Sequence, residues 1–369
     1  MKLVNLTVAL TFAAAGTALA QDKWVVGQSA PLSGGNAKFG QDIRDGAQAY
    51  FAMLNAKGGV QGRSIELQSL DDKNDRKTAG ENAKKLLANK NLVALFGFAS
   101  ATLSLDALPQ AAANEVAFFA PFSGANAVRT NNPVLFTVRA SYGDELQKML
   151  DFWTTLGFKR VGVVYYDDEV GKQNLALVTE FLKTINLVPL ALPLSRNAVV
   201  GLAEAQALSD LKPDIVINTV LAVAAATLQK ELLGMGRMIP TSSLSFVGAD
   251  QYIRAAGPAS AGVSIGQVVP SATSQLPVVR ECAKALELAG SKTPMNTTQL
   301  EACFAAKVLA EGIRRARKPV TAQTVLAALT SLGSYDLGGY NIRFSPGAQH
   351  GSKFVELAMV TREGKLSTR

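Results

Sequence analysis

Residue types that catalysis and metal binding usually require are nearly missing from this chain of 369 residues. It has one histidine, His350, and two cysteines, Cys282 and Cys303. A Ser/His/Asp or Cys/His nucleophile system needs a histidine, and ordinary zinc sites need several His or Cys ligands. His350 lies in a polar turn (Gly347–Gly351), which is typical of an exposed loop histidine. We therefore expect no enzyme, no metal and no cofactor.

Sequence motifs that would indicate a specific chemistry are also absent. The chain has no G-x-S-x-G elbow, no P-loop and no G-x-G-x-x-G dinucleotide turn. Two acidic pairs, Asp71-Asp72 and Asp167-Asp168, each follow a predicted strand. Without a third ligand at a defined spacing, we interpret them as caps of the next loop or helix.

Only one long apolar segment is present, at the N-terminus. Lys2 precedes the apolar residues Leu3–Leu19, and Ala18-Leu19-Ala20 fits the cleavage pattern of a secretory signal peptide. We predict a signal peptide over 1–20 that is cleaved near Ala20. No later apolar run approaches the ~20 residues that a transmembrane helix needs. The expected product is an exported soluble protein.

Positive charge is in excess, with a formal net charge of +8, but it is dispersed. The densest cluster, Arg314–Lys318, ends a predicted helix, where cations complement the helix dipole. We therefore expect no nucleic-acid partner, and infer only an attraction for small anions.

Strand-like and helix-like segments alternate along most of the chain. Residues 24–120 form one run of βα units and residues 160–247 a second, with a last strand expected near Leu244–Val247. Because single cores stop growing at ~250–300 residues, two lobes are expected. The predicted fold is α/β, with two doubly wound parallel-sheet lobes. Residues 21–139 plus 270–343 would form the N-terminal lobe and residues 140–269 plus 344–369 the C-terminal lobe.

Polar loops at predicted strand ends are the candidate ligand contacts, because open α/β sheets bind ligands there. The Gly/Ser loop after the first strand ends at Phe39, and Ser100, Ala101 and Thr102 open a helix. Hydroxyls and free N–H groups at a helix start suit a carboxylate, although Ser and Thr there are also ordinary caps. Phe122, Ser123 and Gly124 form a similar loop. Asp250, in the second lobe, is the acid best placed to meet a cationic group.

Cys282 and Cys303 fall on two consecutive predicted helices. In an oxidising compartment they would pair if their Cα atoms lie within ~7 Å. A disulfide and two free buried thiols are both compatible with the sequence.

The chain resembles the type I periplasmic solute-binding proteins of ABC transporters, in particular the branched-chain amino-acid (Leu/Ile/Val) binding group. Four segments carry the resemblance: Ala30–Gln48, Asn55–Asp72, Arg160–Lys172 and Lys212–Gly236. The resemblance implies a periplasmic, monomeric receptor whose partners are a small-molecule ligand and the permease subunits. It also implies three hinge crossovers, at Arg139 and Tyr142, at Val269 and Pro270, and at Asn341–Phe344.

Within that group, the loop matching Ser100–Thr102 holds the ligand carboxylate and an acid matching Asp250 holds its amine. This chain departs from the pattern in having Ala101 and Gly124 in place of hydroxyl residues, and Val170 and Leu221 in place of tyrosines. These changes make the expected site more apolar. Two ligands are therefore considered: a branched-chain type amino acid, and an apolar or aromatic carboxylate without an amine. A ligand-sensing module that feeds a signalling partner is the further alternative.

Overall fold

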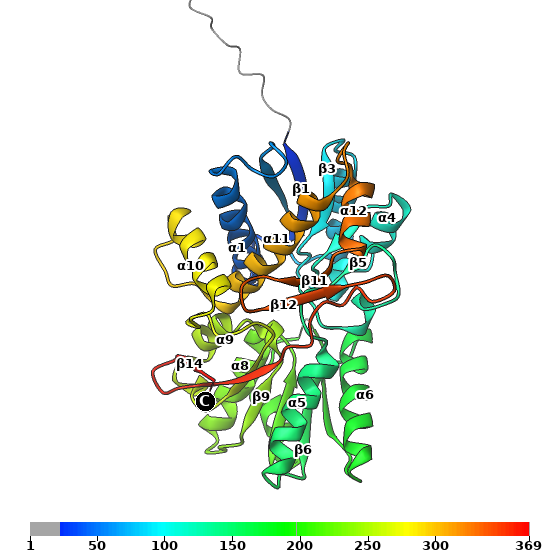
Figure 1. Cartoon of the computed structure of the whole chain (residues 1–369). Helices are drawn as coiled ribbons and strands as arrows, with labels where there is room; N and C mark the ends of the chain where they lie inside the picture. Colours follow the sequence, from blue (N-terminus) through cyan, green and yellow to red (C-terminus); the bar gives the residue numbers. More distant parts are fainter. Residues whose placement is uncertain (1–22, 197, 369) are drawn as a thin grey trace, which may run out of the picture.

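Two α/β lobes stacked end to end make up the molecule (Figure 1). The structure is a computed structural model and describes residues 23–196 and 198–368. The expected signal peptide, 1–20, lies outside the described residues. Within the described part of the chain, every helix is too short or too polar to cross a membrane.

The first lobe is built on a five-stranded sheet in the order β2-β1-β3-β4-β5, and all neighbouring strands are parallel. Its central strand β3 is apolar and buried along its whole length, as expected of a strand covered on both faces. The strands are β1 (Trp24–Ala30), β2 (Ile65–Asp71), β3 (Leu92–Phe96), β4 (Ala117–Phe119) and β5 (Leu135–Phe136).

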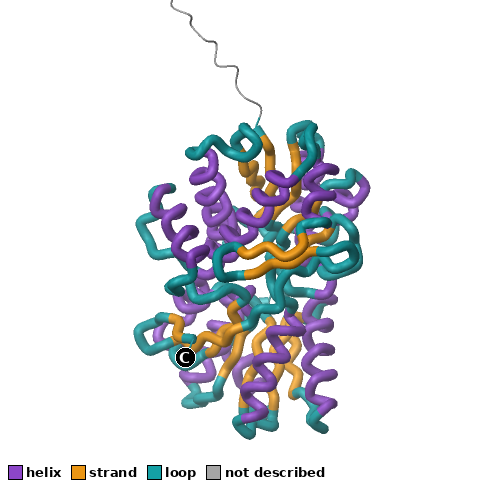
Figure 2. The backbone as a smooth tube through the Cα atoms, in the orientation of Figure 1, coloured by secondary structure: helices purple, strands orange, loops and turns teal. Residues whose placement is uncertain are grey.

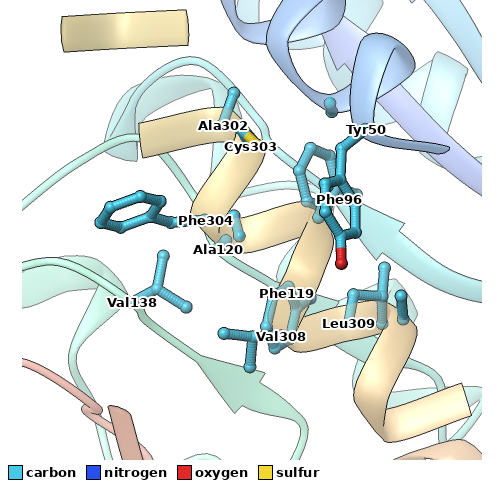
Figure 3. Close-up of a cluster of buried hydrophobic side chains, with 14 of the residues drawn as sticks. Tyr50, Phe96, Phe119, Ala120, Val138, Ala302, Cys303, Phe304, Val308 and Leu309 are labelled. Atoms are coloured by element: carbon cyan, nitrogen blue, oxygen red, sulfur yellow. The ribbon is translucent and has the colours of Figure 1, made fainter. Parts of the chain in front are cut away.

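Helices from both ends of the sequence cover this sheet. They are α1 (Ala37–Asn55), α2 (Arg76–Leu87), α3 (Ala101–Ser104), α4 (Leu108–Ala113), α10 (Pro277–Leu288), α11 (Thr297–Arg315) and α12 (Ala322–Thr330). Helix α11 packs on α1, and Phe96, Phe119 and Phe304 belong to the resulting core (Figure 3). The approach is close at Gly46, where an added Cβ would lie 2.2 Å from the carbonyl oxygen of Gln299.

The second lobe is built on a seven-stranded sheet in the order β14-β13-β10-β9-β8-β6-β7. Strands β6 to β10 pair in parallel, whereas β13 and β14 add an antiparallel edge. The strands are β6 (Val161–Tyr166), β7 (Leu190–Leu194), β8 (Ile215–Thr219), β9 (Thr241–Ser243), β10 (Ser264–Gln267), β13 (Glu356–Val360) and β14 (Leu366–Ser367). Its helices are α5 (Tyr142–Thr155), α6 (Glu169–Thr184), α7 (Leu202–Asp210), α8 (Ala222–Gly234) and α9 (Ala249–Ala256).

The chain passes between the two sheets three times, after β5, after β10 and before β13 (Figure 2). A separate hairpin of β11 (Gly333–Asp336) and β12 (Asn341–Phe344) precedes the third passage. Ile342 and Phe344 of β12 are fully buried in the core of the first lobe. The third passage therefore begins after Phe344, so Asn341–Phe344 is a packed strand and not the hinge that the sequence analysis places there.

Cys282 of α10 and Cys303 of α11 form a disulfide, with their Cα atoms 5.9 Å apart. The structure thus decides between the two states that the sequence leaves open. Both residues are fully buried in the core that α1 shares with these helices.

Two elements differ from the sequence prediction. The strand expected near Leu244–Val247 is a short 3₁₀ turn, and the strand lies earlier, at Thr241–Ser243. Those three residues are polar but buried, and hydrogen bonds compensate: the Trp153 indole N–H donates to Ser242 Oγ at 2.6 Å. The helix that Ser100, Ala101 and Thr102 are expected to open is divided into α3 and α4.

Candidate ligand-binding cleft

A cavity of about 90 Å³ lies between the lobes, where the carboxyl ends of both sheets face each other. Eight of the ten expected ligand contacts line it: Phe39, Ser100, Ala101, Thr102, Phe122, Ser123, Val170 and Leu221. Gly124 and Asp250 do not. The sequence analysis therefore predicts loops that do line one cavity. Two of the residues that it expects there, Gly124 and Asp250, lie outside the cavity.

Ser100 closes the start of α3 on the first-lobe side. Its Oγ accepts a hydrogen bond from the backbone N–H of Leu103 at 3.2 Å, which is the N-cap role considered for it. This bond uses the oxygen as an acceptor, and the Ser100 O–H donates to no other group in the described residues. Thr102 is half-buried beside it. The loop therefore offers hydroxyl donors to an acceptor in the cavity.

Aromatic rings form the wall next to this loop. Phe39 meets Phe122 edge to face, with ring centroids 6.3 Å apart. Deeper in, Ser123 Oγ donates to the Tyr142 hydroxyl at 3.2 Å, and the Tyr142 ring packs on Phe246 with centroids 5.3 Å apart. This part of the cavity provides apolar surface with one hydroxyl pair, and burial raises the pKa of Tyr142, so its phenol is neutral.

Gly124 lies behind this wall because α5 begins against it. The carbonyl oxygen of Gly124 accepts from the Tyr142 backbone N–H at 2.8 Å. A Cβ at position 124 would lie 2.6 Å from that nitrogen and from Tyr142 Cδ1. Glycine stands here because the two backbones nearly touch, and Tyr142 occupies the space that a hydroxyl side chain would need.

The second-lobe side of the cavity is formed by the starts of two helices. Val170 and Gly171 belong to the first turn of α6, and Leu221 precedes α8 without a side-chain cap. The Tyr166 hydroxyl accepts from the Leu221 backbone N–H at 3.2 Å. Unpaired N–H groups and the positive end of the helix dipole are thus directed to the same space.

The charge of the lining is one-sided. No Asp or Glu among the described residues lines the cavity, and Arg196 is its one charged side chain. Arg196 is itself paired with Asp168, so the helix starts are what favour a negative group in the cavity, and the lack of a lining acid disfavours an unpaired cation.

Comparison with known proteins agrees with this geometry. The sequence matches the periplasmic binding protein family over residues 23–365. The chain belongs to this family. It is 30% identical to a substrate-binding periplasmic protein from Ralstonia solanacearum, whose crystal structure it matches with a TM-score of 0.87 over 94% of this chain and 100% of that one.

Other relatives of this periplasmic binding protein carry branched-chain amino-acid names. A possible leucine/isoleucine/valine-binding protein from Rhodopirellula baltica has a TM-score of 0.88 at 25% identity, over 95% of this chain and 98% of that one. Leu/Ile/Val-binding protein homolog 7 of Brucella melitensis is 25% identical over 99% of this chain and 95% of the relative. Shorter matches to Leu/Ile/Val-binding proteins of Rhizobium johnstonii and Brucella abortus span only 24% and 18% of those relatives' length. The two-lobe fold is that of the type I periplasmic binding proteins.

Asp250 lies in the first turn of α9, beside the main cavity of this periplasmic binding protein and not in it. It lines a small adjoining space together with Asp42, while Phe39 and Gln251 border both spaces. Gln251 Nε2 also donates to the carbonyl oxygen of Gly35 at 3.3 Å, which joins the lobes here. Asp250 lies outside the cavity because a 3₁₀ turn replaces the expected strand. This turn carries Phe246 and Val247 to the cavity instead.

The expected hinge residues lie on the first two passages. Arg139 follows β5, Tyr142 begins α5, and Val269 and Pro270 follow β10. Arg139 is buried, 2% exposed, among charged residues from both lobes. Tyr142 is also a cavity wall, a role that the sequence analysis did not give it.

The acidic pairs and the histidine have structural partners. Asp71 accepts from the backbone N–H of Leu32 at 2.9 Å and so fixes the Gly/Ser loop, and Asp168 caps α6 by accepting from Gly171 N–H at 2.9 Å. His350 Nδ1 lies 3.1 Å from Thr137 Oγ1, and burial lowers its pKa. In the described residues, no group of three or more His, Cys, Asp or Glu is arranged to hold a metal.

Several cavity residues were not predicted from the sequence. Tyr166 ends a strand that reads as uniformly buried, and Arg196 stands in a polar loop after β7. The position of Arg196 just past a strand end was the one available signal, because that edge faces the ligand in open α/β sheets. The unpredicted lining residues also include Asn74, Asn174, Thr219, Phe246 and Gln251.

Proposed function

We propose that this protein is the substrate-binding component of an ABC importer. In this proposal it is exported to the periplasm with residues 1–20 removed, binds a small carboxylate with an apolar body, and delivers it to permease subunits. The single observation that carries the proposal is the cavity between the lobes, which is lined from both sides, has hydroxyl and N–H donors, and has no acid among its described lining residues.

Family membership supports the transport role, and the position of the cavity supports ligand-induced closure. Because Ser100 and Phe122 come from one lobe and Val170 and Leu221 from the other, a bound molecule contacts both lobes only when they are close together. A ligand with that requirement stabilises the closed arrangement by its difference in affinity for the two states. The passages after β5 and β10 would act as the hinges, with Arg139, Tyr142, Val269 and Pro270 in them.

The lining supports a ligand without an ammonium group. A buried ammonium needs a carboxylate or several acceptors, and Asp250 is separated from the cavity by Phe39 and Gln251. The donors at Ser100 and Thr102 and at the starts of α6 and α8 suit a carboxylate. The aromatic wall of Phe39, Phe122 and Phe246 suits an aliphatic or aromatic body.

A branched-chain amino acid is the second candidate. The names of the relatives favour it, and so does the closeness of Asp250, which borders the adjoining space. The two candidates differ in one group, the α-ammonium, so matched ligands separate them.

Thermal-shift measurements on the mature chain test the proposal. A ligand that binds the folded protein raises its melting temperature according to RT ln(1 + [L]/Kd). We expect 4-methylpentanoate or benzoate to raise it in a concentration-dependent manner. If neither these carboxylates nor any amino acid changes the melting temperature, the cavity is not a small-carboxylate site.

A further inference from the structure

Arg196 lies at the outer end of the cavity, the end farthest from the passages between the lobes. It follows β7, an edge strand of the second sheet, whereas the passages leave from β5 and β10. Asn74, which follows the edge strand β2 of the first sheet, lines the same cavity. Arg196 and Asn74 therefore line one cavity from the two lobes, and the Arg196 side chain is 33% exposed.

The orientation of Arg196 is fixed on two sides. Its Nε donates to Asp168 Oδ2 at 2.7 Å, and its Nη2 lies 2.6 Å from the same oxygen. Its Cζ lies 4.2 Å from the centroid of the Tyr166 ring, whose hydroxyl is held by the Leu221 N–H. Nη1 donates no hydrogen bond within the described residues. A planar group held on one edge and one face keeps its remaining edge, with Nη1, available to a ligand.

The acids near Arg196 are already engaged. Asp168 uses its second oxygen to cap α6, and Asp167 forms an ion pair of 2.9 Å with Lys172. Glu169, at the start of α6, interacts electrostatically with Arg76 of the first lobe. None of these carboxylates makes a hydrogen bond with Nη1.

We propose that Arg196 binds the ligand's carboxylate through Nη1 and selects an anionic ligand over its neutral counterpart. This inference rests on the proposed function, and it names the second-lobe partner of the carboxylate and the charge class of the ligand. A charge-assisted hydrogen bond from a pre-oriented guanidinium is stronger than one from a hydroxyl and loses less side-chain entropy on binding. Because Arg196 belongs to the second lobe and Ser100 to the first, a carboxylate held by both favours closure.

Calorimetry with a carboxylate and its amide tests the inference. The probes are 4-methylpentanoate against 4-methylpentanamide, with benzoate against benzamide as a second pair, on the mature wild-type chain, Arg196→Gln and Lys172→Gln. The last is a matched control: it removes a cation of α6 whose side chain is 63% exposed and does not line the cavity. We expect Arg196→Gln to weaken the affinity for the carboxylate by about tenfold or more and to leave the affinity for the amide unchanged. Lys172→Gln should leave both affinities unchanged.

The outcomes separate the two proposals. Suppose that the wild-type chain binds the carboxylate, and that Arg196→Gln lowers the affinities for acid and amide equally or changes neither affinity. The role of Arg196 is then refuted, and the proposal of a carboxylate receptor stands. If the wild-type chain binds none of the carboxylates, both proposals fall. Melting temperatures of the unliganded variants within a few degrees of wild type show that the folded state is intact. A further variant, Arg196→Lys, should retain part of the preference for the acid, because it keeps the positive charge but not the planar, forked arrangement of N–H donors.

Discussion

Arg139 and Glu301 form an ion pair of 3.5 Å with both side chains buried, and it joins the first passage between the lobes to α11. Arg139 also lies 3.5 Å from Glu145 of α5, so one guanidinium connects an acid of each lobe. Burial raises the pKa of Glu301 to about 7, against the opposing attraction of Arg139 and with a further rise from Glu145. This junction is therefore sensitive to pH in a range where most carboxylates are not.

The first prediction concerns that sensitivity. A carboxyl whose pKa is about 7 in the folded state and 4.5 otherwise binds its proton more tightly when folded. Its contribution to the free energy of unfolding is therefore fully present below about pH 4.5 and is lost as pH rises through about 7. Glu301→Gln removes this titration. The melting temperature of the variant minus that of wild type should increase from pH 5 to pH 8, and a pH-independent difference would contradict the assignment.

A second prediction uses two glycines in close contacts. At Gly171 an added Cβ would lie 1.9 Å from the Tyr166 carbonyl oxygen, and at Gly46 it would lie 2.2 Å from that of Gln299. Both Gly→Ala variants should lose about 1–3 kcal/mol of stability through overpacking. Only Gly171→Ala should also weaken ligand, because it displaces the start of α6 at the cavity. Denaturant unfolding measures the loss of stability and calorimetry the ligand affinity of both variants. Equal ligand affinities of the two variants would show that the start of α6 does not contribute to ligand binding.

A third prediction concerns the disulfide between α10 and α11. The bond joins residues 21 positions apart, and closing a loop of that order stabilises by about 3 kcal/mol in the chain-entropy account. The double variant Cys282→Ala, Cys303→Ala should lose roughly that amount in denaturant unfolding. Its ligand affinity should not change, because neither residue lines the cavity. A large loss of affinity would show that the α10–α11 packing shapes the cleft.

The fourth prediction concerns Asp250. If the ligand has no amine, Asp250→Asn leaves the affinity for 4-methylpentanoate unchanged within about twofold. The reason is that the Asp250 side chain lies in the adjoining space with Asp42 and not in the ligand cavity. Leucine binding that is abolished by the same change would show instead that Asp250 meets an ammonium group. Isothermal calorimetry with both ligands on wild type and variant gives the answer.

Much of the fold can be predicted from the sequence because buried parallel strands are nearly continuous apolar runs. Leu92–Phe96 and Val161–Tyr166 are of this kind, and the helices between them are amphipathic. The strand Thr241–Ser243 could not be found in this way. Its three hydroxyl residues look like a loop, and only contacts distant in sequence, such as that of Trp153 with Ser242, make their burial favourable.

The candidate site could be predicted as a set of loops but not as a lining. Ser100, Phe122 and Leu221 line the cavity because each follows the end of a strand. The order of strands and helices along the chain is enough to predict that position. Whether Asp250 or Arg196 enters it depends on a 3₁₀ turn and on an ion pair with Asp168, which are tertiary facts. Gly124 shows the same limit: only the structure shows that the start of α5 excludes a side chain there.

The central claim is that the cleft receives a carboxylate without an amine. L-Leucine and 4-methylpentanoate differ only in the α-ammonium group, so calorimetric titration of the mature wild-type chain with each compares the two ligand classes directly. We predict that 4-methylpentanoate binds at least as tightly as leucine. Binding of leucine at tenfold or higher affinity, with 4-methylpentanoate weak or silent, would contradict the claim.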